Sequence, residues 1–242
     1  MPILLIVKPL CIALLAILFI QYSGIDLYLS GLVYLPAEHW QLKNSWLLDT
    51  VIHRGGRLVI AVAVMSMLLM TLLSLLPRYR NHAYRSVCIY LLVATLLSIG
   101  TVSLLKQITT LPCPWDVVGL GGNRHYLLLG QVFSPRLQTG HCFPSGHASG
   151  GFALFSIYFA ALRVSQLRRY SDTGRTEKLW LLPGLITGTV FGLAQQLRGA
   201  HFLSHDIASA AVCWFVCGTL AVILWPPESA QNVIRVPTIS AD

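Results

Sequence analysis

Charged residues are scarce in this sequence of 242 residues. Asp, Glu, Lys and Arg make up 11% of it, whereas hydrophobic residues make up 55%. A soluble domain usually contains about 25% charged residues. The deficit excludes an ordinary soluble domain and favours a protein that lies in a lipid bilayer.

The sequence also lacks a recognisable nucleic-acid-binding motif, although its formal net charge is +8. Most basic residues lie in short segments between apolar stretches, where membrane topology and lipid headgroups account for them. None of the six cysteines forms a CxxC pair, and no Cys/His cluster has the spacing of a zinc site. We therefore expect the bilayer as a partner, and no nucleic acid, metal, cofactor or obligate protein partner.

Five long stretches contain no Asp, Glu, Lys or Arg: 9–25, 58–76, 87–105, 179–197 and 207–225. Each approaches the length of about 20 residues that a helix needs to cross a bilayer. A sixth apolar stretch, from about Ser145 to Leu162, is rich in the small residues that closely packed membrane helices use. The pattern predicts an all-α membrane bundle of about six transmembrane helices in one domain, 1–242, with spans at about 3–22, 58–76, 87–105, 145–162, 179–197 and 207–225.

Lys and Arg in the short connections predict the orientation, because basic residues favour the cytoplasmic side. The connection 77–86 carries Arg78, Arg80 and Arg85, and the connection 163–178 carries Arg163, Arg168, Arg169, Arg175 and Lys178. We expect both connections and both termini in the cytoplasm of a cell with a bacterial-type inner membrane. The segments 26–57, 106–144 and 198–206 would then face the periplasm.

The segment Phe143-Pro144-Ser145-Gly146-His147 stands at the start of the fourth predicted span. Proline is well tolerated at a helix start, and backbone N–H groups at a helix N-terminus favour a phosphate. Ser145 adds a hydroxyl donor, and His147 could protonate a leaving oxygen as a general acid. The alternative is an ordinary helix start with an incidental histidine.

A second polar group lies between the last two spans, where Arg198, His201, His205 and Asp206 occur within nine residues. A neutral imidazole can attack phosphorus, a carboxylate can orient that imidazole, and an arginine can bind phosphoryl oxygens. The alternative is the ordinary polarity of a short loop. Lys106, at the end of the third span, would by itself be a lysine reaching the membrane surface.

In this order the three elements resemble the type 2 phosphatidic acid phosphatase superfamily of membrane lipid phosphatases. That family has a lysine, six residues and Arg-Pro, then Pro-Ser-Gly-His, then an arginine, five residues, a histidine, three residues and an aspartate. Pro144-Ser145-Gly146-His147 is a full match. The resemblance implies His201 as the nucleophile and His147 as the acid/base residue. It also implies a phosphate held by Lys106, Ser145 and Gly146, without a metal.

The sequence departs from the family pattern at both arginines. Cys113 occupies the first arginine position, and Gln195 occupies the second. Arg198, about one helical turn before His201, is the nearest substitute for the second. Three further arginines are candidates to replace the lost positive charge: Arg54, Arg57 and Arg124.

The aspartate position of the pattern holds His205, and Asp206 follows one residue later. We assign the catalytic carboxylate to Asp206 and give His205 a supporting role. Cys113 and Cys142 share the outward segment 106–144, in a compartment that permits disulfides. We expect a bond between them, which would close a loop of about 30 residues.

The resemblance implies a phosphatase that hydrolyses a lipid-linked phosphate or diphosphate through a phosphohistidine. Two alternatives stay open: transfer of the phosphoryl group to another lipid, and a non-enzymatic carrier of lipids or anions. The missing arginines are consistent with a carrier, but a carrier has little need for two histidines beside a phosphate site. Haloperoxidases share the motifs but are soluble, so the apolar spans count against them. Undecaprenyl diphosphate, phosphatidylglycerophosphate, phosphatidic acid and the phosphates of lipid A all fit the sequence as substrates.

Overall fold

The computed structural model describes residues 3–37, 39–79, 82–168 and 175–226. All regular elements in these ranges are helical, which confirms the predicted all-α bundle. Five of the described helical stretches are long and apolar enough to cross a membrane. Arg80 and Arg169, two of the arginines used to predict the orientation, lie outside the described residues.

The five stretches correspond to five of the predicted spans. They are α1 (Leu4–Tyr22), η2 with α3 (Trp46–Gly55 and Gly56–Leu75), α4 (His82–Ile108), α5 with α6 (Gly146–Phe152 and Phe155–Arg168), and α9 (Leu203–Leu224). The shorter described elements are α2 (Ile25–Val33), α7 (Arg175–Leu179), and the 3₁₀ turns η1 (Gln41–Asn44), η3 (Pro77–Tyr79), η4 (Pro114–Asp116) and η5 (Leu129–Gln131).

The remaining predicted span forms α8 (Leu182–Leu197), which has 16 residues. A helix of that length extends about 24 Å, less than the roughly 30 Å of a bilayer core. The count of six transmembrane helices therefore stays a prediction.

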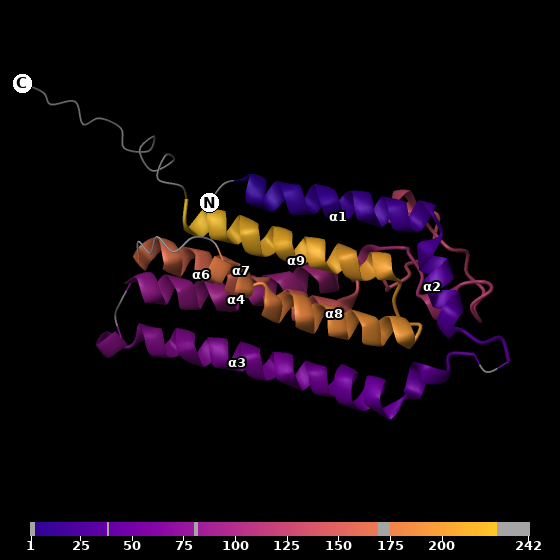
Figure 1. The fold of residues 1–242 in the computed structure, drawn as a ribbon, viewed down its shortest axis with the longest axis horizontal. Coiled ribbons are helices and arrows are strands. Elements are labelled where there is room, and N and C mark those ends of the chain that lie inside the picture. The colour runs from indigo at the N-terminus through magenta and orange to yellow at the C-terminus, as the bar shows by residue number, and fades with distance from the viewer. Residues whose placement is uncertain (1–2, 38, 80–81, 169–174, 227–242) are drawn as a thin grey trace, which may run out of the picture.

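The helices run roughly along one axis (Figure 1). The start of α1, the end of α9 and the connection from α3 to α4 lie at one end, and α2 lies with the loop segment 109–145 at the other. Helix α9 packs against α1, α4, α5 and α6. Its Trp214 lies in a buried aromatic cluster with Phe155 and Phe159 of α6.

Helices α5 and α8 touch backbone to backbone. A Cβ built on Gly151 would lie 2.3 Å from the Gly188 nitrogen, and one built on Gly188 would lie 2.3 Å from the Phe152 ring. No side chain larger than hydrogen fits at either position without displacing a helix. The small residues that mark this span in the sequence therefore serve close helix packing.

The N-terminus of α9 is held by a buried carboxylate from α2, an element that the sequence did not predict. Asp26 accepts hydrogen bonds from the Ser204 backbone N–H at 3.1 Å, the Ser204 hydroxyl at 2.5 Å and the Tyr126 hydroxyl at 2.9 Å. A carboxylate satisfies free N–H groups at a helix start and interacts favourably with the helix dipole. Asp26 thereby fixes the point at which the polar segment 198–206 enters α9.

The predicted bond between Cys113 and Cys142 is present. Hydrogen bonds hold the loop that this disulfide closes at several points. The Trp115 N–H donates to the Gly199 carbonyl at 3.1 Å, and the Arg124 guanidinium donates to the carbonyls of Gln138 and Thr139 in the same loop and of Thr110 just before it. The disulfide links the residues that follow α4 to the residues that precede α5.

Removal of this disulfide should destabilise the protein. The two cysteines are 29 residues apart, and the loss of loop closure over that length lowers the free energy of unfolding by about 3–4 kcal/mol in the chain-entropy model. Chemical denaturation of Cys113→Ser in detergent micelles should show this decrease, and Cys11→Ser, which removes an exposed free cysteine, should leave stability unchanged. Equal stabilities for Cys113→Ser and the wild type would contradict the prediction.

Candidate active site

A cavity of about 460 Å³ opens at the end of the bundle that carries α2 and the segment 109–145. Both histidines implied by the resemblance, His147 and His201, line it. Three basic side chains line the same cavity: Arg57, Lys106 and Arg198. With His53, which also lines it, the cavity combines three imidazoles with a concentration of positive charge.

His147 lies in the first turn of α5, and two rings fix its orientation. Its imidazole stacks on Phe191 of α8 with the ring centroids 4.6 Å apart, and it meets His53 of η2 in an edge-to-face contact at 4.7 Å. Its Nε2 is buried and has no hydrogen-bond partner among the described residues. A buried nitrogen without a protein partner in a cavity wall is available to exchange a proton with a bound molecule.

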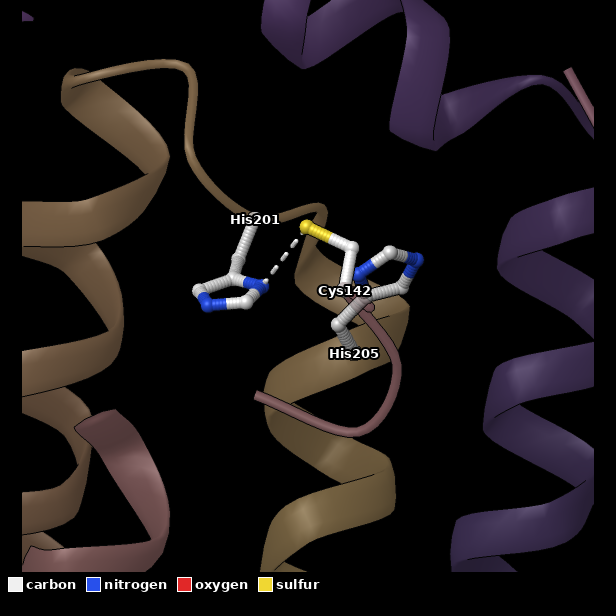
Figure 2. Close-up of side chains that lie close together, drawn as sticks. All are labelled: Cys142, His201 and His205. Carbon is white, nitrogen blue, oxygen red and sulfur yellow. Dashed lines mark hydrogen bonds between the residues drawn. The ribbon is translucent and has the colours of Figure 1, made fainter. Parts of the chain in front are cut away.

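His201 lies in the turn between α8 and α9, next to Cys142 of the disulfide with Cys113 (Figure 2). Its Nδ1 is 3.5 Å from the Cys142 sulfur. A disulfide sulfur carries no proton and can only accept, so this contact favours a proton on Nδ1 and leaves the lone pair of Nε2 free. Burial, together with the neighbouring His205 and Lys106, lowers the pKa of His201 well below its usual range. The imidazole is therefore neutral at neutral pH, as a nucleophile requires.

Ligand atoms of Cys142, His201 and His205 lie within 4.8 Å of one another, which is a spacing that a metal ion could bridge (Figure 2). Cysteine binds metals as the thiolate. In this structure the Cys142 sulfur is bonded to Cys113 and offers no thiolate. With the disulfide intact, the group supplies two histidines and no third strong ligand.

Lys106 and Gly146 meet on one wall of the cavity. A Cβ built on Gly146 would lie 3.6 Å from the Lys106 Nζ, an ordinary contact distance, so the ammonium group lies beside the start of α5. Gly146 lines the cavity at the start of α5, whereas Ser145 does not. The Ser145 N–H donates to the His205 carbonyl at 3.1 Å, and the Ser145 hydroxyl is buried without a partner among the described residues.

Arg198 is held by three acceptors. Its Nη2 donates to Asp49 Oδ1 at 2.6 Å, its Nε to the Lys43 carbonyl at 2.8 Å, and its Nη1 to Gln195 Oε1 at 3.3 Å. Gln195, at the family's arginine position, thus accepts a hydrogen bond from the substitute arginine. Arg198 lines the cavity in a fixed orientation.

The three candidate replacement arginines lie in different places. Arg57 lines the cavity, on the first turn of α3. Arg54 has a side chain that is 72% exposed, where it pairs with Asp49 at 2.9 Å. Arg124 binds loop carbonyls, as described above. Of the three, Arg57 is the one that could contact a molecule in the cavity.

Asp206 and His205 do not line this cavity. Asp206 Oδ2 accepts a hydrogen bond from Gln196 Nε2 at 2.7 Å and lines a separate cavity of about 400 Å³ between α1, α8 and α9. His205 is buried with its ring edge-to-face against Phe143. No hydrogen bond joins Asp206 to His201 in the described part of the chain.

Sequence reasoning missed two polar residues of the site. His53 lines the cavity, and its Nδ1 is 3.3 Å from Asp49 Oδ1. Both lie on η2, a π-helical segment that continues into α3. One feature of the sequence could have pointed to this segment. Arg54 and Arg57 lie on the predicted outward side, against the positive-inside rule.

A sequence model described as the PAP2 superfamily matches residues 86–228, which is more than half of the chain. The chain belongs to the PAP2 superfamily. No curated protein and no solved structure gives a match. Membership supports phosphatase activity on phosphate esters. Lys106, His147 and His201 lie inside the PAP2 match, whereas Asp49, His53 and Arg57 lie outside it.

The lowered pKa of His201 predicts a pH dependence of stability. As the pH falls through about 6.5, the unfolded chain binds a proton at this histidine and the folded chain does not. The unfolded state then holds more protons, so the free energy of unfolding falls with pH, by up to about 1.4 kcal/mol per pH unit. Denaturation between about pH 7 and pH 5 should show a smaller fall for His201→Gln than for the wild type, and identical slopes would contradict the prediction.

Proposed function

We propose that this protein hydrolyses the phosphate or diphosphate of a membrane lipid through a phosphohistidine at His201. The observation that carries the proposal is the single cavity in which His147 and His201 face the same space as Lys106, Arg57 and Arg198. A dianionic phosphoryl group is the ligand class that matches imidazoles surrounded by three cations.

In the first step, the Nε2 lone pair of His201 attacks phosphorus, and the P–O bond to the leaving group breaks. His147, in its protonated form, gives its proton to the departing oxygen. In the second step, His147 takes a proton from water, the water oxygen attacks phosphorus, and the P–N bond to His201 breaks. Inorganic phosphate leaves, and both histidines return to their starting states.

The cations supply electrostatic stabilisation throughout. Arg198 offers planar donors in a fixed orientation, whereas Lys106 offers a compact point charge. Arg57 stands in for the arginine that Cys113 replaces, and Arg198 stands in for the arginine that Gln195 replaces. At the first family arginine position the disulfide forms part of the cavity wall, since Cys113 and Cys142 both line the cavity.

A lipid substrate is supported by the surroundings of the cavity. Its lining also includes Ile60 of α3 and Ile99 of α4, so apolar side chains on two helices long and apolar enough to cross a membrane continue into the polar site. Of the connections predicted as cytoplasmic, the described turn η3 after α3 lies at the opposite end of the bundle (Figure 1). We infer that the site faces the periplasm of a bacterial-type inner membrane.

Two other functions use the same cavity. A phosphotransferase would pass the phosphoryl group from His201 to a lipid alcohol in place of water, and a carrier would bind a lipid phosphate without breaking a bond. The unpartnered Nε2 of His147 beside the cavity favours chemistry over carriage, because a carrier has no use for an acid/base residue.

The test is phosphate release by purified protein from four lipids: undecaprenyl diphosphate, phosphatidylglycerophosphate, phosphatidic acid and lipid A phosphates. We expect at least one to be hydrolysed and His201→Ala to lower that rate by at least about 1000-fold, because the nucleophile is lost. His125→Ala, which removes an exposed histidine of the loop segment 109–145, is the control. Binding without phosphate release would support the carrier, and full activity of His201→Ala would refute the proposed nucleophile.

A further inference from the structure

The carboxylate of Asp49 pairs with three basic side chains at or near the cavity. Asp49 Oδ1 accepts a hydrogen bond from Arg198 at 2.6 Å and lies 3.3 Å from His53 Nδ1, while Oδ2 pairs with Arg54 at 2.9 Å. All three ion pairs found among the described residues involve Asp49. Asp49 does not itself line the cavity, whereas Arg198 and His53 do.

We propose that Asp49 is a positioning residue of the active site, holding Arg198 toward the phosphate and His53 against His147. The inference rests on the proposed function, since it concerns the residues assigned there to phosphate binding and proton transfer. It assigns a role to a segment of the chain that lies outside the PAP2 match.

The contact with Arg198 differs from an ordinary surface ion pair. The side chains of Arg198 and Asp49 are 11% and 18% exposed, whereas Arg54 is 72% exposed. A partly buried, charge-assisted hydrogen bond at short distance is stronger than a solvated pair, which contributes little. The other two acceptors of Arg198 are the neutral Lys43 carbonyl and Gln195 amide. Asp49 is therefore the charged partner that determines where this guanidinium points.

The contact with His53 extends the same influence to His147. A carboxylate can only accept a hydrogen bond, so Asp49 favours a proton on His53 Nδ1. The neutral ring then has its lone pair on Nε2. That ring meets the His147 ring edge-to-face at 4.7 Å, while Phe191 stacks on the His147 ring at 4.6 Å. His53 and Phe191 together confine the plane of the acid/base residue.

The local backbone explains how one residue can reach both partners. Asp49 and His53 lie four residues apart on η2, a π-helical segment, and such segments are rare and often occur at functional sites. The segment crosses the end of α8, with which it is in contact. Asp49 thus lies between Arg198, just after α8, and His53, one turn further along η2.

The experiment compares kcat and KM for Asp49→Asn, Asp49→Glu and wild type. Asp49→Asn retains the shape of the side chain but loses its charge, and misplacement of substrate contacts should lower kcat/KM by about 100-fold, with KM raised and kcat lowered. Asp49→Glu restores a carboxylate and should recover part of this loss. Glu177→Gln is the matched control, because it removes a carboxylate that bonds Ser165 on α6, and it should keep wild-type kinetics.

A purely structural role for Asp49 gives a different result. In that case Asp49→Asn would lower the yield or thermal stability of folded protein but leave kcat and KM per folded molecule unchanged, and this result would overturn the inference. His53→Asn supplies a second measurement that leaves the Arg198 pair intact. We expect it to lower kcat more than it raises KM, and an unchanged kcat would refute the role of His53.

Binding of inorganic phosphate separates this inference from the proposed function. If the wild type releases no phosphate from any lipid, the proposed function fails, but calorimetric titration still reports on the orientation of Arg198. We expect Asp49→Asn to bind inorganic phosphate at least about 10-fold more weakly than wild type and Glu177→Gln. Equal affinities in all three proteins would show that Asp49 does not position the phosphate site.

Discussion

The backbone contact between α5 and α8 at Gly151 and Gly188 is the constraint on which the site depends. Because the two helices touch without intervening side chains, the first turn of α5 lies against the last turns of α8. His147 is thereby stacked on Phe191, and Gly146 faces the same space as Gln195 and Arg198. A larger residue at Gly151 would move His147 away from Gln195 and Arg198. Helix packing inside the bundle thus determines how the residues that line the cavity at its end are placed relative to one another.

A second constraint is electrostatic. Arg57, Lys106 and Arg198 line one cavity, and like charges in a partly buried space repel one another. Asp49 neutralises one side of this group through Arg198, and the cavity itself holds no carboxylate among its lining residues. A bound phosphate would supply the missing negative charge. The same unbalanced charge that makes the empty cavity unfavourable therefore favours a phosphoryl ligand and its transition state.

The parts of the site that sequence could predict are those encoded locally. Pro144 to His147 form a helix start that consecutive residues identify. The shared outward segment of Cys113 and Cys142 was sufficient to expect their bond. Asp206 shows the limit of such reasoning. Neighbouring residues on a helix point about 100° apart, so adjacency to His205 did not reveal that its carboxylate faces a different cavity.

The residues that sequence missed come from distant segments. Asp49 and His53 reach the site because η2 packs against α8, and Asp26 reaches α9 because α2 folds across its N-terminus. These placements depend on tertiary packing between segments that are 100 or more residues apart, for which one sequence has no local signal. Arg57 was distinguishable from Arg54 and Arg124 only when the cavity was known.

Binding of orthovanadate, a phosphate analogue, to Arg57→Ala tests most directly whether this cavity holds phosphate with substitute cations. Isothermal titration would compare it with wild type and with Arg136→Ala, which removes an exposed arginine from the same end of the bundle. The account predicts that wild type and Arg136→Ala bind alike and that Arg57→Ala binds at least about 10-fold more weakly, through the loss of one charge-assisted contact. Equal binding by all three proteins would contradict the account.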